Sequence, residues 1–183
     1  YGNNEAYWSV LTNPKFKKNI LDESKKIEFF ESGNGNIFTL ANIANENGVS
    51  FFGKNALDFG CGVGRLTFSL APYVANITGL DISSGHLEEA EKNKTMKNIQ
   101  NVFFHQSDID IKKFGSYDII ISLIVLQHNR PNLMKNYIQQ LLSMLNTSGC
   151  AFLHIPYYIP NYNNSNVKNI MEMHYLPLEE INE

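Results

Sequence analysis

The stretch that decides the fold is LDFGCGVGRLT, residues 57–67, where glycines at 60, 62 and 64 follow an apolar run. Glycine loses more conformational freedom on folding than any other residue, so this density has a structural cause. Four interpretations are open: a loop that binds a dinucleotide, a loop that holds a phosphate, a site for another adenosine compound, or a tight turn.

The spacing of the loop argues against two of these interpretations. A P-loop has the pattern G-x-x-x-x-G-K-[ST], and Leu66 occupies the position of its lysine. A dinucleotide loop, G-x-G-x-x-G, needs a glycine at 65, where Arg65 stands. We expect this bulky side chain to lie where a helix would approach a pyrophosphate. Asp58, two residues before the first glycine, suits a positively charged ligand group better than phosphates.

Composition and charge narrow the class of protein. The chain has 183 residues, 43% hydrophobic and 18% charged, as in one ordinary globular domain. A net charge of −3 does not indicate a surface for nucleic acid or anionic membrane. No apolar run reaches the ~20 residues of a transmembrane helix. The two cysteines and the histidines lack metal-ligand spacing, so we expect no metal and a reduced, cytoplasmic protein.

Apolar runs alternating with helical patterns predict an α/β fold with a doubly wound, mainly parallel sheet behind N-terminal helices. Ligands of such sheets bind beyond the carboxyl ends of the strands, which places residues 60–64, Asp81, Asp108 and residues 124–130 together. The predicted strands are 55–60, 76–83, 101–109, 117–128 and 149–158, and the predicted helices are 21–33, 36–48, 65–74, 85–98 and 131–146.

The motif DFGCGVG at 58–64 resembles motif I of the class I S-adenosylmethionine-dependent methyltransferases. Asp81, seventeen residues past Gly64, matches the acid that accepts hydrogen bonds from both ribose hydroxyls in that family. Asp108 matches the acid that faces the adenine amino group. YDIIISLIVLQH, 117–128, resembles the fourth-strand motif, whose end passes the methionine moiety, and LNTSGCAFLH, 145–154, resembles the turn into the fifth strand.

This resemblance implies a Rossmann-like methyltransferase fold and S-adenosyl-L-methionine as the cofactor, with S-adenosyl-L-homocysteine as the product. It divides the chain into an N-terminal helical lid segment (1–53), a cofactor-binding core (54–155) and an acceptor-side loop with the start of a helix (156–183). YWSVLTNPKF, 7–16, resembles the lid of small-molecule members. The implied cofactor-binding residues are Asp58, Gly60, Cys61, Gly62, Gly64, Asp81, Ile82, Asp108, Ile109 and Leu123.

The resemblance also implies methyl transfer by in-line displacement to an oxygen, nitrogen or carbon of a small molecule. Transfer depends mainly on alignment, and a base is needed only for an acceptor that must lose a proton. The candidate bases are His128, His154 and Tyr157, with His174 as a further candidate, whereas His86 and His105 are assigned no role. Enzymes that methylate amino groups of nucleic acids carry an Asp/Asn-Pro-Pro-Tyr signature at the end of the fourth strand. LQHN occupies this place here, at 126–129, which favours a small-molecule acceptor over DNA.

One departure from the family leaves alternatives open. Its members complete the sheet with two more strands, and this sequence, which starts at Tyr1 and ends in LPLEEINE, stops before them. We therefore expect a fragment whose fifth strand is an exposed apolar edge, a surface at which copies of the chain can associate. The alternatives to an active methyltransferase are a non-catalytic cofactor-binding module and an inactive domain of a larger protein. A third alternative is a nicotinamide-dependent reductase, against which Arg65 argues.

Overall fold

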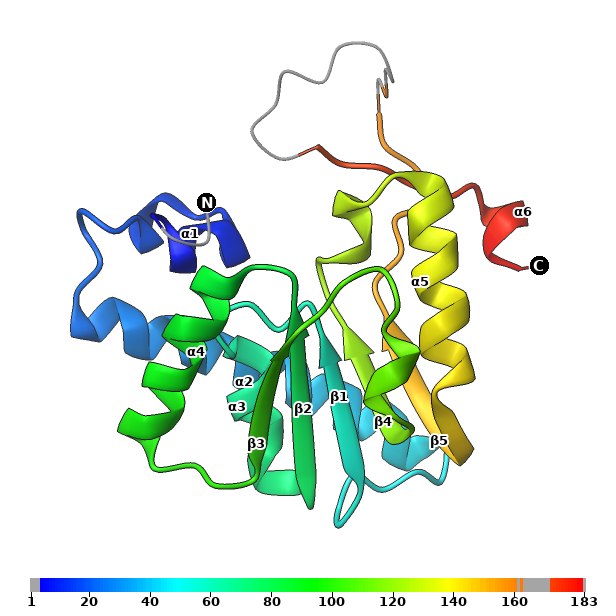
Figure 1. Cartoon of the computed structure of the whole chain (residues 1–183), viewed down its shortest axis with the longest axis horizontal. Coiled ribbons are helices and arrows are strands. Elements are labelled where there is room, and N and C mark those ends of the chain that lie inside the picture. The colour runs from blue at the N-terminus through cyan, green and yellow to red at the C-terminus, as the bar shows by residue number, and fades with distance from the viewer. Residues whose placement is uncertain (1–3, 161, 163–171, 183) are drawn as a thin grey trace.

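The strands form one parallel sheet in the computed structural model, which describes residues 4–160, 162 and 172–182 (Figure 1). The order is β3-β2-β1-β4-β5, and every neighbouring pair is parallel. This confirms the predicted doubly wound sheet and places β5 at one edge. The strands are β1 (Asn55–Phe59), β2 (Asn76–Asp81), β3 (Val102–Gln106), β4 (Tyr117–Ser122) and β5 (Leu145–Leu153).

Helices cover both faces of the sheet, as the continuous apolar run of β4 predicts. Ile119 and Ile121 of β4 pack in the cluster that includes residues of α2 and α3, whereas Ile120 packs in the cluster that includes residues of α5. The helices are α1 (Ala6–Leu11), α2 (Glu23–Glu46), α3 (Arg65–Leu70), α4 (Ser84–Lys97), α5 (Pro131–Ser143) and α6 (Leu178–Ile181).

The prediction of two separate helices before the sheet is wrong, because α2 is one helix of 24 residues that runs through Gly33. Gly33 serves close packing and does not end a helix. A Cβ at this position would lie 2.5 Å from the Arg65 carbonyl oxygen and 2.6 Å from Ser69 Oγ. The missing side chain therefore lets α2 cross α3 at short distance.

The strand predicted over 117–128 is also too long, because β4 ends at Ser122. Ile124 has a φ of 64°, in the left-handed region that β-branched residues rarely adopt. A short 3₁₀ turn then covers Leu126–His128. The chain thus leaves the sheet six residues early and folds over the end of β1, where the side chains of residues 123–125 line a cavity.

The start of α4 follows local sequence rules closely. Ser83 is the N-cap residue, and its Oγ accepts a hydrogen bond from the His86 backbone N–H at 3.3 Å. This cap brings the first turn of α4 next to the end of β2, at the carboxyl edge of the sheet, where α1 also lies (Figure 1). Among the described residues, no helix combines the length and the apolar character needed to cross a bilayer.

Candidate functional site

A cavity of about 440 Å³ lies at the carboxyl edge of the sheet. Its walls come from the loops that follow β1, β2, β3 and β4, from Tyr137 of α5, and from Ser9 and Val10 of α1. It lies where the strand order reverses between β1 and β4, the usual ligand position in doubly wound sheets.

The glycine loop forms one wall of this cavity and allows α1 to pack against it. Gly62 has a φ of 55°, and a Cβ there would lie 2.6 Å from Val10 Cγ2. Gly60 has a φ of 78°, and its missing side chain makes room for Val125. Two separate features therefore require glycine at both positions: a positive φ angle and the close approach of a neighbouring segment.

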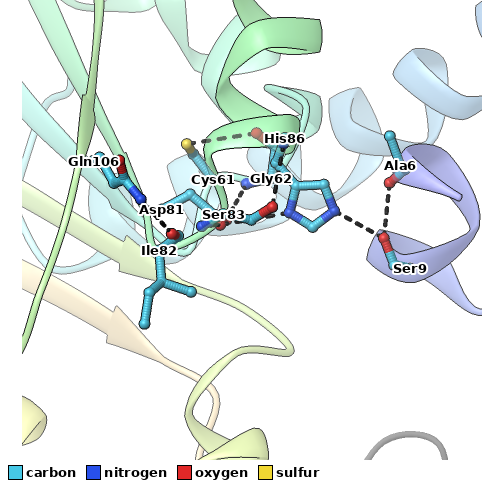
Figure 2. Close-up of polar contacts among 9 residues, drawn as sticks. All are labelled: Ala6, Ser9, Cys61, Gly62, Asp81, Ile82, Ser83, His86 and Gln106. Carbon is cyan, nitrogen blue, oxygen red and sulfur yellow. Dashed lines mark hydrogen bonds and ion pairs between the residues drawn. The ribbon is translucent and has the colours of Figure 1, made fainter. Parts of the chain in front are cut away.

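Asp81 is the carboxylate of the cavity wall, and Figure 2 shows its contacts. Its Oδ2 accepts a hydrogen bond from the Gly62 backbone N–H, and its Oδ1 accepts one from Ser83 N–H, both at 2.8 Å. These two donors fix the side chain between the glycine loop and α4. A carboxylate accepts about four hydrogen bonds, so Asp81 keeps capacity for a ligand in the cavity.

His86, for which the sequence predicted no role, also lines the cavity. Its Nδ1 lies 3.4 Å from Asp81 Oδ1, and its Nε2 lies 2.8 Å from Ser9 Oγ (Figure 2). Only 14% of the His86 side chain is exposed. The available signal was its place in the first turn after Asp81, because helical side chains lean toward the N-terminus of their helix.

The predicted site residues divide into two groups. The cavity brings together Gly60, Gly62, Asp81, Ile82, Leu123 and His128. The structure does not place the others in its lining: these are Asp58, Cys61, Gly64, Asp108, Ile109, His154 and Tyr157.

Asp58 lies beneath the loop, with 2% of its surface exposed. The Thr67 hydroxyl donates a hydrogen bond of 2.6 Å to Asp58 Oδ2. Burial raises the pKa of the Asp58 carboxyl to about 6, against the lowering effects of the Thr67 hydrogen bond and the Arg65 guanidinium. Asp58 does not line the cavity, but its charge interacts with that of Asp81, which does.

Arg65 does not occupy the place that its position in the loop predicted. Its guanidinium is buried against α2, where Nη1 donates a hydrogen bond of 2.8 Å to Asn36 Oδ1. The side chain therefore does not line the space above the loop. The spacing of the glycines still differs from the dinucleotide pattern, but the steric argument against a pyrophosphate is wrong.

Asp108, the predicted adenine ligand, is directed at a lysine. Its Oδ2 lies 2.7 Å from Lys113 Nζ, and 63% of its side chain is exposed. The Lys113 hydrogen bond lowers the pKa of the Asp108 carboxyl. The preceding residue, Ser107, is the one that lines the cavity after β3.

The candidate bases lie in different surroundings. His128 lines the cavity, and its Nδ1 donates to the Glu172 carbonyl oxygen at 3.0 Å. His154 follows β5 and is exposed, as is Tyr157 at 65%. His174 is buried, with its Nδ1 2.6 Å from Tyr162 Oη. His128 is therefore the predicted base that the fold brings to the cavity.

A family model described as a methyltransferase domain matches residues 51–174, more than half of the chain. The chain belongs to this family. The matched region contains the sheet, the glycine loop, Asp81 and His128. This confirms the family that the motifs at 58–64 and at the ends of the strands indicated.

A similar curated protein is the ubiquinone biosynthesis O-methyltransferase of Coxiella burnetii, which is 35% identical over 85 residues. The match covers 45% of this methyltransferase domain and 36% of that enzyme. The ubiquinone biosynthesis O-methyltransferase of Acinetobacter baumannii is 28% identical over 90 residues, with 38% of its length covered. The chain thus spans little more than a third of these relatives.

Two solved structures share the fold of the domain. One is an S-adenosylmethionine-dependent methyltransferase from Clostridium acetobutylicum, with a TM-score of 0.60, 23% identity, and 70% of this chain and 52% of that chain covered. The other is the magnesium protoporphyrin IX methyltransferase of Synechocystis, bound to S-adenosylhomocysteine. It has a TM-score of 0.64 and 20% identity, with 96% of this chain and 78% of that chain covered.

Proposed function

We propose that this methyltransferase domain binds S-adenosyl-L-methionine and transfers its methyl group to an oxygen, nitrogen or carbon atom of a small molecule. One observation carries the proposal. A carboxylate held by two backbone N–H groups, Asp81, faces a cavity of about 440 Å³ next to a glycine loop. This volume lies in the range of pockets that enclose a small-molecule ligand.

The residues that line the cavity support this cofactor. Asp81 is proposed to accept hydrogen bonds from the ribose hydroxyls, and Ile82 and Ser107 to border the adenine. Gly60, Gly62 and Leu123 are proposed to border the methionine portion. Asp108 reaches an adenine ring only if its carboxylate leaves Lys113, so Ser107 is the better-placed residue after β3.

The cofactor supplies a methyl group on a positively charged sulfur. The protein's part is orientation, which can lower such barriers by about 7–11 kcal/mol. Asp58 favours a positive charge above the loop through its field. We propose that His128, at the acceptor side of the cavity, accepts a proton where the acceptor must lose one, an effect of about 10²–10⁴-fold on the rate.

The named relatives support a small-molecule acceptor. The proteins from Coxiella burnetii and Acinetobacter baumannii carry the name of ubiquinone biosynthesis, and the Synechocystis protein that of magnesium protoporphyrin IX. The acceptor of this chain is proposed at the level of chemical class alone. Free thiols at Cys61 and Cys150 agree with the proposed reduced, cytoplasmic setting.

Ligand-induced stabilisation tests the cofactor assignment. S-Adenosylmethionine or S-adenosylhomocysteine at about 100 times its dissociation constant is expected to add about 2.7 kcal/mol to the free energy of unfolding. Asp81→Ala is expected to abolish the thermal shift, because it removes the acceptor of the ribose hydroxyls.

Asp110→Ala is the matched control, since Asp110 is exposed and its carboxylate accepts a hydrogen bond from the Lys112 backbone N–H in the same turn. A shift with NAD and none with the two sulfur compounds would contradict the proposal. If the domain binds S-adenosylmethionine but methylates no compound in a panel of alcohols, amines and activated carbon acids, it is a binding module and the proposed methyl transfer is contradicted.

A further inference from the structure

We propose that His86 is a positioning residue that latches α1 over the cavity and so retains the bound nucleoside. The inference rests on the proposed function for the identity of the ligand. It starts from a chain of contacts that runs from the glycine loop through Asp81 and His86 to Ser9 on α1 (Figure 2).

The direction of the hydrogen bonds shows how the latch is built. Asp81 Oδ1 is a carboxylate oxygen and only accepts, so its contact with the ring needs a proton on His86 Nδ1. Nε2 of the neutral ring then accepts from the Ser9 hydroxyl in the 2.8 Å contact. Nδ1 faces the Asp81 carboxylate at 3.4 Å. One imidazole, donating from Nδ1 and accepting at Nε2, thus connects the proposed ligand-binding carboxylate with α1.

The contacts of α1 indicate that this connection affects the position of α1 at the cavity. Val10, the residue after Ser9, packs on Gly62, and both Ser9 and Val10 line the cavity. α1 has only six residues, too few to be a stable helix in isolation. Its position therefore depends on tertiary contacts, and the His86 contact links α1 through one side chain to Asp81.

The chain contains one tryptophan, Trp8, and it lies on α1. Its fluorescence reports the environment of α1 without any assay of activity. We expect His86→Ala to raise the acrylamide quenching of Trp8 in the ligand-free protein. We also expect it to speed dissociation of S-adenosylhomocysteine by about tenfold, because α1 is no longer held over the bound nucleoside.

Ser9→Ala removes the other end of the contact and leaves His86 beside Asp81. It is expected to produce the same changes, and the double variant is expected to be no worse than either single variant, because both remove one interaction. His105→Ala is the control, since His105 is exposed, stacks on Phe114 and lies outside the cavity lining.

Unchanged Trp8 quenching and dissociation in both single variants would overturn the latch, as would additive effects in the double variant. The quenching measurement needs no ligand, so it separates the two proposals. If S-adenosylhomocysteine fails to bind the unaltered protein, the proposed function fails, and Trp8 quenching in the two variants still decides whether His86 holds α1.

Discussion

Asp58 is the buried acid of the glycine motif, and its environment links stability to pH. Burial raises the pKa of its carboxyl to about 6 in the folded chain, from 3.8. The folded state therefore binds the proton more tightly than the unfolded state. The contribution of Asp58 to the free energy of unfolding falls as the pH rises from about 4 to about 6, by about 3 kcal/mol in total.

Asp58→Asn is expected to remove this pH dependence. The amide oxygen can still accept the Thr67 hydrogen bond, and no charge is buried. Relative to the unaltered protein, the variant should gain stability between about pH 4 and about pH 7, approaching 3 kcal/mol. Urea unfolding across this range measures the difference.

Asp118→Asn provides a control of opposite sign. Hydrogen bonds from the Asn55 backbone N–H and the Asn146 side chain lower the pKa of the Asp118 carboxyl. Its stabilising contribution is present above the unfolded pKa and is lost as the pH falls, so this variant should lose stability toward neutral pH. If the difference in free energy of unfolding between Asp58→Asn and the unaltered protein did not change with pH, the raised pKa of the Asp58 carboxyl would be contradicted.

At the scale of elements, the crossing of α2 and α3 explains why a 24-residue helix contains two glycines. Gly33 is buried at the crossing, whereas a Cβ at Gly35 would meet nothing within 4 Å. The same residue type thus has a packing role at one position and none that the structure shows two residues later.

The two glycines predict opposite responses to the same substitution. Gly35→Ala should stabilise the protein by up to about 1 kcal/mol, because alanine is the better helix former. Gly33→Ala should destabilise it by about 1–3 kcal/mol, since the new methyl group collides with the Arg65 carbonyl. Denaturant midpoints of the pair measure both effects, and equal shifts of the two variants would contradict the close crossing.

At the scale of the whole molecule, the parallel sheet collects the functional loops at one end. Binding of S-adenosylhomocysteine should therefore slow amide hydrogen exchange in residues 60–64, 81–86 and 123–128, which lie far apart in sequence and meet at the cavity. Residues 48–54 and 115–116 precede β1 and β4 at the opposite end and serve as internal controls. If only these control segments were protected, the ligand would bind at the opposite end of the sheet, and the proposed site would be contradicted.

The periodicity of the sequence was sufficient to predict the order and type of the main elements. Alternation of buried strands and helices requires right-handed crossovers, and these bring the carboxyl ends of the strands together. The early end of β4 was not predictable, because residues 123–128 are as apolar as the strand itself. Only the contact of Val125 with the Gly60 backbone shows why the chain turns there.

The sequence by itself determined the family, the sheet and the place of Asp81, because glycine spacing and strand ends are local properties of the chain. Only the tertiary structure decided which side chains share the cavity. It turned Asp108 to Lys113, buried Arg65 against α2, and brought His86 between Asp81 and Ser9. Lys113 lies five residues after Asp108, but Asn36, the partner of Arg65, and Ser9, the partner of His86, are distant in sequence. In LDFGCGVGRLT the partner of Gly62 is likewise Val10 of α1.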